Sequence, residues 1–131
     1  MTNSQRSFII DADISPVASI NYFDSVVDVI ADDTRAVNWQ SALTQTQDFF
    51  RLFMVPGMGH CAGGPGPDRF DALTALENWV ERDIAPESII ASKIVGGEVV
   101  RTRPLCVYPE VANYNGSGNT DEAANFRCVA P

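Results

Sequence analysis

The sequence predicts an α/β fold in which a few parallel strands are flanked by helices, and three observations support this prediction. Short apolar runs of strand length alternate along the chain with stretches of helical periodicity, which is typical of a parallel sheet covered by helices. The length of 131 residues is that of one domain rather than two. Finally, 45% of the residues are hydrophobic and 20% are charged, which is the composition of a globular chain and not of a disordered one.

A strand and a helix are predicted first. Residues 8–10 (FII) are typical of a short buried strand, and it ends at two carboxylates, Asp11 and Asp13. The dipeptide Ser15-Pro16 is a typical N-cap followed by proline at the first helical position. Apolar residues then recur at helical spacing, which predicts a helix over residues 16–31.

The middle of the chain predicts a loop, a strand and a second loop. Residues 33–48 are polar and without a clear period, so we expect a surface loop with a helical turn at residues 38–43. Residues 49–55 (FFRLFMV) give the strongest strand signal in the chain. The strand stops at residues 56–67, where five glycines and three prolines in twelve positions prevent any regular element.

A second helix follows the glycine-rich loop. Asp68 is predicted to be its N-cap, and the apolar face that follows ends near Asp83, with Pro86 preventing continuation. Two strands alone do not make a stable parallel sheet, because such sheets need several neighbours and cover on both faces. The chain is therefore expected to be part of a larger fold.

The last third of the chain is rich in β-formers and turns. Residues 89–95 and 99–103 flank a Gly-Gly pair, which predicts either a hairpin or one strand with an extended segment. From residue 104 onward, turn residues dominate. We therefore expect one partial domain over residues 1–131, with a strand-and-helix part at 7–103 and an irregular tail at 104–131.

The charge balance excludes two classes of partner. Nine Lys and Arg against seventeen Asp and Glu give a net charge of −8. Such a chain repels the phosphates of nucleic acids and the anionic surface of membranes, so we expect neither as a partner. No apolar run approaches the ~20 residues that span a bilayer. Residues 1–7 lack the apolar core of a secretory signal.

His60 and Asp11 are the candidates for chemistry. His60 is the only histidine, and both residues follow expected buried strands, where α/β proteins place catalytic side chains. In α/β-hydrolases the catalytic residues follow the chain order Ser, acid, His, and Asp11 precedes His60 accordingly. The histidine would take a proton from the nucleophile, and the carboxylate would hold its other ring nitrogen. The same pattern also fits a loop histidine with solvated or helix-capping aspartates.

The nucleophile of such a site is missing from the sequence. No Gly-x-Ser-x-Gly motif occurs, and Ser117 lies between two glycines without a strand before it or a helix after it, so we expect a turn there. We expect no metal or other cofactor, because His60 beside Cys61 lacks the spaced ligands of a zinc site. Cys106 and Cys128 form a plausible pair, which leaves Cys61 with a free thiol or a bond to something outside the chain.

Residues 50–66 (FRLFMVPGMGHCAGGPG) closely resemble the histidine segment of the tannase and fungal feruloyl esterase family. The similarity extends over residues 8–128 and includes the Asp11 segment, the second helix and the tail. The resemblance implies the C-terminal portion of an α/β-hydrolase fold. It also implies a serine esterase that acts on esters of aromatic, phenolic acids such as gallate and ferulate.

The same resemblance implies roles for individual residues. His60 matches the general base, and Asp11 matches its orienting carboxylate, with Asp13 as the alternative acid. Cys106 and Cys128 match a family disulfide. Cys61 matches a cysteine bonded to another beside the nucleophilic serine, which an upstream segment or a separate chain would supply.

We therefore expect a carboxylic ester hydrolase to which these residues contribute His60 and Asp11 but not the serine, so that the 131-residue chain alone is inactive. Two alternatives stay open: a non-catalytic remnant or interaction module that folds with a partner chain, and a two-chain enzyme in which another polypeptide supplies the serine and its adjacent cysteine. Disulfide usage favours an oxidising compartment, either the periplasm or the outside of the cell.

Overall fold

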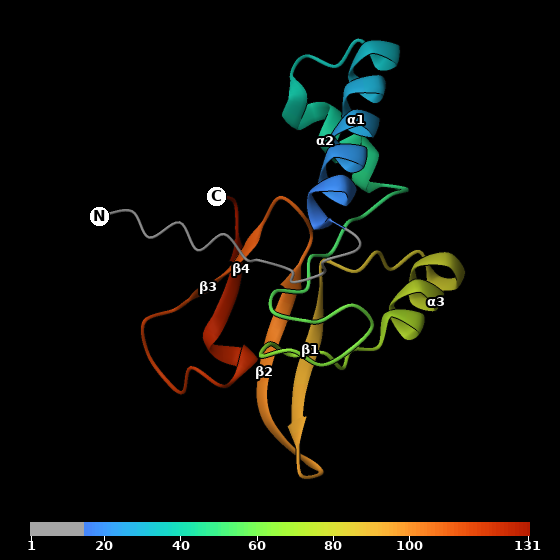
Figure 1. The fold of residues 1–131 in the computed structure, drawn as a ribbon. Coiled ribbons are helices and arrows are strands. Elements are labelled where there is room, and N and C mark those ends of the chain that lie inside the picture. The colour runs from blue at the N-terminus through green and yellow to red at the C-terminus, as the bar shows by residue number, and fades with distance from the viewer. Residues whose placement is uncertain (1–14) are drawn as a thin grey trace.

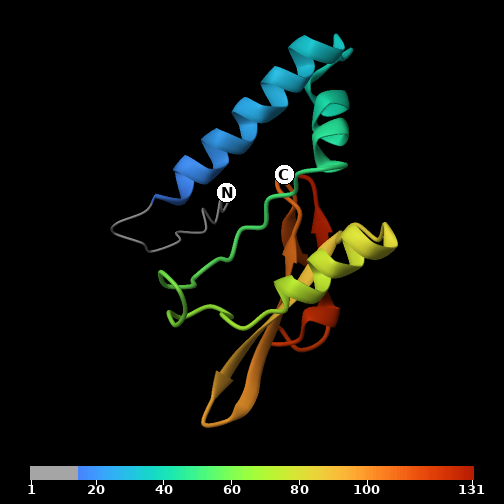
Figure 2. The same ribbon diagram turned by 90° about the vertical axis from the view of Figure 1, so that its right-hand side faces the viewer.

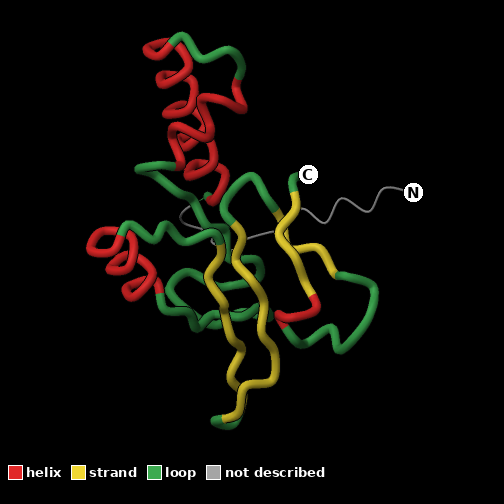
Figure 3. Tube along the Cα trace, turned by 180° about the vertical axis from the view of Figure 1, so that it is seen from behind, coloured by secondary structure: helices red, strands yellow, loops and turns green. Residues whose placement is uncertain are grey.

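The computed structural model describes residues 15–131, which form three α-helices, two β-hairpins and a short 3-10 helix (Figure 1). The elements are α1 (Pro16–Thr34), α2 (Trp39–Gln47), α3 (Ala72–Arg82), β1 (Ser88–Val95), β2 (Glu98–Cys106), β3 (Val111–Tyr114), η1 (Ala123–Asn125) and β4 (Phe126–Val129). Helices α1 and α2 pack together at one end of the molecule, and the β1–β2 hairpin points its turn toward the other end. The two hairpins lie next to each other, as the tube in Figure 3 also shows.

Helix α1 confirms the predicted helix and extends it by three residues, from Ala31 to Thr34. It begins at Pro16 directly after the N-cap Ser15, and it ends at Arg35, which adopts the left-handed conformation with φ 51°. Its buried face carries Phe23 and Val27. No helix within residues 15–131 has the combination of length and apolar character that crossing a bilayer requires.

Helix α2 lies within residues 33–48, where the sequence predicts a loop with a helical turn at residues 38–43. The helical turn is confirmed, but the loop prediction is wrong at residues 33–34, which belong to α1, and at residues 44–47, which continue α2. Asn38 caps the helix because its side chain accepts a hydrogen bond from the Ser41 N–H at 2.9 Å. Ala42 and Leu43 form a small core with the buried residues of α1. The helix is short and mostly polar, so packing against α1 stabilises it more than its own periodicity does.

Asp24 joins α1 to the segment after β2 through a long hydrogen bond. The Tyr108 hydroxyl donates to Asp24 Oδ2 at 3.5 Å, while Oδ1 is buried without a hydrogen-bond partner among the described residues. Burial raises the pKa of Asp24 above its ordinary value of 3.8; the Tyr108 hydrogen bond opposes that shift, and the charge of Asp28 adds to it. The ionised carboxylate therefore destabilises the folded state at neutral pH.

Replacing Asp24 with Asn is expected to raise the free energy of unfolding at pH 7 by up to about 1 kcal/mol, because the substitution removes a partly buried charge. The gain should shrink as the pH falls toward 3.8, since the wild-type carboxyl then becomes protonated in the folded state first. Urea unfolding at pH 7 and pH 4 measures both effects. Asp32→Asn, at an exposed position of the same helix, is the control. A loss of stability at pH 7 would contradict the expectation.

The strand predicted over residues 49–55 is wrong as a regular element. The segment is extended, but it contributes a single antiparallel bridge between Phe53 and Val107, together with a hydrogen bond from the Tyr108 N–H to the Leu52 carbonyl at 2.8 Å. Its apolar residues instead pack into two small clusters, with Phe50 against α1 and Val55 against the β1–β2 hairpin. The apolar pattern of this segment therefore reflects burial of its side chains, and not pairing of its backbone in a sheet.

The predicted parallel strands have no counterpart in residues 15–131, where every strand pair is antiparallel. No parallel pair forms here because residues 49–55 contribute only an isolated bridge, and because β1 and β2 are joined by only two residues, a link that gives antiparallel neighbours. Gly96 and Gly97 both have positive φ, 62° and 89°, which matches the two-residue turns that suit a right-twisted hairpin. The hairpin alternative is thus confirmed. The strand predicted at residues 8–10 lies outside the described residues.

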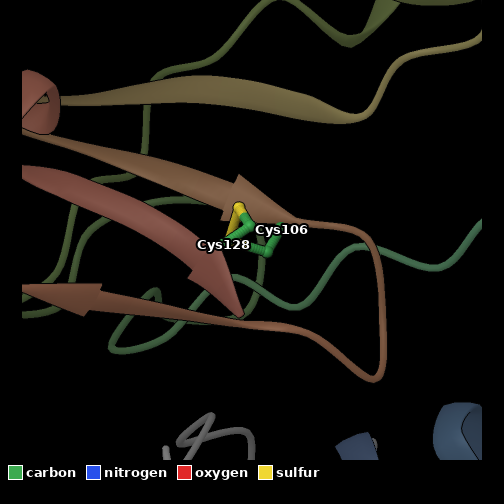
Figure 4. Close-up of a disulfide and its surroundings, with 2 residues drawn as sticks. All are labelled: Cys106 and Cys128. Carbon is green, nitrogen blue, oxygen red and sulfur yellow. A yellow bond between two sulfur atoms is a disulfide. The ribbon is translucent and has the colours of Figure 1, made fainter. Parts of the chain in front are cut away.

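The chain after residue 104 is more regular than expected. Strands β3 and β4 form a second hairpin, and the disulfide between Cys106 and Cys128 ties the end of β2 to β4 (Figure 4). The two Cα atoms are 5.5 Å apart, which is in the usual range for a disulfide. The pairing that the family resemblance implied is therefore confirmed.

Candidate active site

His60 lies at the exposed tip of a tightly folded turn, residues 56–67, which we call the histidine turn. Two backbone hydrogen bonds close it: the Gly59 N–H donates to the Gly63 carbonyl at 3.0 Å, and the Gly66 N–H donates to the Gly57 carbonyl at 2.9 Å. Figure 2 shows the chain between α2 and α3 bulging outward from the strands in this region. The inner bond leaves His60, Cys61 and Ala62 at the tip.

The glycines are required by the close approach of the two arms of the turn. A Cβ atom at Gly64 would collide with the carbonyl oxygen of Gly57, and one at Gly66 would collide with the carbonyl oxygen of Pro56. Gly64 also has a positive φ of 83°, a conformation that glycine adopts without strain. The backbone is thus packed against itself while the tip side chains are exposed.

Asp68 was predicted to cap α3, and this is wrong. The N-cap is Asp71, whose side chain accepts a hydrogen bond from the Thr74 N–H at 2.9 Å. Asp68 instead turns its carboxylate toward the histidine turn and accepts a hydrogen bond from the Gly63 N–H at 2.6 Å. The signal that distinguishes the two aspartates is spacing, because Asp71 stands three residues before Thr74, where an N-cap oxygen reaches the N3 amide.

Lys93 of β1, like Asp68, contacts the histidine turn, and the sequence did not predict this contact for either residue. Its ammonium nitrogen lies 3.3 Å from Asp68 Oδ1. The Gly63 N–H is the main cause that holds the pKa of Asp68 below its ordinary value of 3.8, and Lys93 adds to this effect against the opposing effect of burial. Asp68 is therefore charged at neutral pH.

The other predicted site residues are placed as follows. Asp11 and its alternative Asp13 lie outside the described residues, so their position relative to His60 stays a prediction. Cys61 is exposed and its thiol forms no disulfide within the described part of the chain. Ser117 lies in a turn after β3, as expected, and Gly118 beside it accepts a hydrogen bond from the Tyr114 hydroxyl at 2.7 Å.

Two hollows on the described surface lie away from the histidine turn. One of about 330 Å³ lies between α2 and the segment that follows β2, and it is lined by Gln47 and Glu110 among others. Another, of about 240 Å³, is mostly apolar and lies under α3, where the Arg51 guanidinium is 5.3 Å from the ring centre of Trp79. Neither is lined by His60, which residues 15–131 present on an open surface.

Sequence comparisons match most of this chain to esterases. The model of the family described as tannase and feruloyl esterase matches residues 8–129. An esterase of Xanthomonas campestris pv. campestris is 45% identical over 139 aligned residues, which cover 91% of this chain and 24% of the relative. The mono(2-hydroxyethyl) terephthalate hydrolase of Piscinibacter sakaiensis is 55% identical over 94 residues, which cover 70% of this chain and 16% of that enzyme.

Solved structures agree with the sequence matches. An esterase from Aspergillus oryzae superposes with a TM-score of 0.71 at 32% identity, covering 88% of this chain and 25% of that protein. The chain thus spans a quarter or less of the length of these relatives. Because the family match extends over nearly the whole sequence, the chain belongs to the tannase and feruloyl esterase family.

Proposed function

We propose that this chain supplies the general base of a serine carboxylesterase, and that His60 is that base. The observation that carries the proposal is the position of His60, at the exposed tip of a glycine-constrained turn inside the segment that matches the esterase family. A base must reach the proton that it abstracts, and a rigid support keeps it within hydrogen-bond distance of the nucleophile.

The proposed reaction has two halves. The serine oxygen attacks the ester carbonyl carbon while His60 takes the serine proton, and the ester C–O bond then breaks as His60 returns that proton to the leaving alcohol. Water next attacks the acyl-serine carbonyl carbon while His60 takes a proton from that water, and the acyl–serine C–O bond breaks as His60 returns the proton to the serine oxygen, which releases the acid and restores the serine. Asp11 accepts a hydrogen bond from the other ring nitrogen, which fixes the tautomer and stabilises the imidazolium; Asp13 is the alternative for this role.

The nucleophile is proposed to come from polypeptide outside these 131 residues. The relatives are about four or more times as long as the matched region, and the sequence holds no Gly-x-Ser-x-Gly motif. The exposed thiol of Cys61 supports a covalent link to that polypeptide, in which a cysteine beside the serine bonds to Cys61. Such a bond would hold the serine and His60 segments together. Whether one chain or two provide these parts, the chemistry is the same.

Esters of aromatic carboxylic acids are the proposed substrates. Feruloyl groups, named in the family description, and terephthalate, named for the Piscinibacter enzyme, share an aromatic ring conjugated to the acyl carbon, directly in terephthalate and through a carbon–carbon double bond in the feruloyl group. We further propose that the protein works in an oxidising compartment outside the cytoplasm, because a disulfide such as Cys106–Cys128 persists there.

The test uses a chimaera in which residues 8–129 replace the homologous segment of the mono(2-hydroxyethyl) terephthalate hydrolase. We expect the chimaera to hydrolyse mono(2-hydroxyethyl) terephthalate, whereas the purified 131-residue chain releases product only at the uncatalysed rate. The physical reason is that the chain alone lacks a nucleophile, whose removal costs many orders of magnitude in rate. Hydrolysis is measured by product release.

Two results would contradict the proposal. A folded chimaera without activity would favour the alternative of a non-catalytic module that folds with a partner. Robust turnover of an aryl ester by the 131-residue chain, lost on replacing His60, would mean that the nucleophile lies within these residues.

A further inference from the structure

The position of His60 depends on polar anchors, because burial does not hold the tip of the histidine turn. His60, Cys61 and Ala62 are all exposed. Glycines flank them on both sides, and glycine has the greatest backbone freedom of any residue. The two backbone hydrogen bonds close the turn on itself. Met58 packs its first arm against the apolar cluster of the hairpin, whereas the second arm, at Gly63 and Gly64, is held by polar contacts.

Asp68 connects the turn to the edge of β1. Its side chain is only 7% exposed and accepts the Gly63 N–H at 2.6 Å, directly beside the inner hydrogen bond of the turn. Its own backbone is fixed as well: the N–H groups of Asp68 and Arg69 donate to the Ser92 carbonyl at 3.1 Å, and the Ser92 N–H donates to the Arg69 carbonyl at 2.7 Å. The Asp68 carboxylate thus links the histidine turn to β1 through hydrogen bonds.

Lys93 holds the next residue of the turn, Gly64, through its carbonyl group. Its ammonium group donates to the Gly64 carbonyl at 2.7 Å and to Asp68 Oδ1 at 3.3 Å, and its side chain is 19% exposed. The N–H of Gly63 and the C=O of Gly64 are therefore held by one ion pair. Gly64 in turn lies against the carbonyl of Gly57 in the opposite arm, so the restraint reaches both arms.

Both oxygens of the Asp68 carboxylate have partners, and Lys93 donates to two acceptors. Partly buried ion pairs of this kind contribute little net stability, because desolvation offsets their attraction. Arg69 approaches Asp68 only at 4.0 Å and is 65% exposed, so it adds little. The pair is suited to orienting the turn rather than to stabilising the fold.

We propose that Asp68 and Lys93 form a clamp that orients the histidine turn and are positioning residues for the base of the esterase. This inference rests on the proposed role of His60. An error of about 1 Å in the position of a catalytic group can lower the rate on the order of 100-fold. Neither residue touches the reacting atoms; each acts through the backbone at Gly63 and Gly64.

Amide hydrogen exchange in the 131-residue chain tests the clamp directly. Lys93→Ala and Asp68→Ala are expected to speed exchange of the Gly63 amide by roughly tenfold or more, since both loosen the turn. Lys93→Arg should restore slow exchange, because it keeps a charged donor. Arg101→Ala is the matched control: Arg101 is the cross-strand partner of Lys93 and pairs with Asp121 at 2.6 Å, away from the turn. If Lys93→Ala does not fold, Lys93→Met takes its place, because methionine keeps most of the side-chain length and removes the charge.

The second readout is the chimaera, in which Lys93→Ala should lower kcat on the order of 10- to 100-fold and leave KM within about threefold. Unchanged Gly63 exchange, or an equal effect of Arg101→Ala, would overturn the clamp. So would an unchanged kcat in an active chimaera. An inactive parent chimaera would instead count against the proposed function, and the exchange data would then decide the clamp alone.

Discussion

Replacing His60 with Ala in the chimaera is expected to lower kcat/KM for ester hydrolysis on the order of 1000-fold or more. Without the imidazole, no group at the tip of the histidine turn can take the proton of the attacking serine. The loss should appear mainly in kcat, because the base acts in the transition state and contributes little to substrate binding. Steady-state kinetics with mono(2-hydroxyethyl) terephthalate measures the effect.

The substitution should leave the fold intact, because His60 is exposed and lies outside both apolar clusters. Equal thermal unfolding of the two proteins checks this point. Arg127→Ala, at an exposed position of β4, should keep kcat/KM within about threefold of the parent and is the matched control. Activity within tenfold of the parent after His60→Ala would remove His60 from the role of base.

Breaking the disulfide between Cys106 and Cys128 is expected to lower the free energy of unfolding by about 3 kcal/mol. The bond closes a loop with a sequence separation of 22 residues, and cutting it returns conformational freedom to the unfolded chain. The strands β3 and β4 have only four residues each, so a hairpin of this size depends on the cross-link for much of its order. Denaturant unfolding of Cys106→Ala/Cys128→Ala measures the loss.

The control separates the bond from the side chains. Cys106 is 6% exposed, so truncating it also removes packing, whereas reducing the wild-type disulfide removes the bond alone. Reduction should therefore account for most of the loss. Cys61→Ala, at an exposed free thiol, should change stability little. If reduced and oxidised wild-type chains unfold at the same denaturant concentration, the disulfide does not stabilise the tail.

Local signals made much of the fold predictable from the sequence. The proline after Ser15 and the apolar period that follows located α1, and the Gly-Gly pair located the β1–β2 hairpin. Residues 49–55 were misassigned because an apolar run reports burial, and here the burial comes from packing into two clusters rather than from a strand ladder. Whether an apolar segment pairs in a sheet depends on distant partners that no local pattern encodes.

The sequence predicted the candidate base, His60, but not the Asp68 and Lys93 contacts that hold the histidine turn. His60 stood out as the single histidine in a glycine-rich loop, and the structure places it at an exposed tip. Asp68 and Lys93 are 25 residues apart in the sequence and meet only because Arg69 and Ser92 pair across the fold. Aspartate before an apolar helix is most simply explained as a cap, so the contact with Gly63 had no sequence signal of its own.

The central claim is that His60 and Asp11 form the histidine–carboxylate pair of an esterase. A crystal structure of the active chimaera tests it most directly through the distance from the nearer imidazole nitrogen of His60 to the nearest carboxylate oxygen of Asp11. The account predicts a hydrogen bond of about 2.7–3.2 Å, with the other ring nitrogen facing the serine. A structure in which Asp11 lies on a different face of the protein from His60, with no carboxylate of this chain against the imidazole, would contradict it.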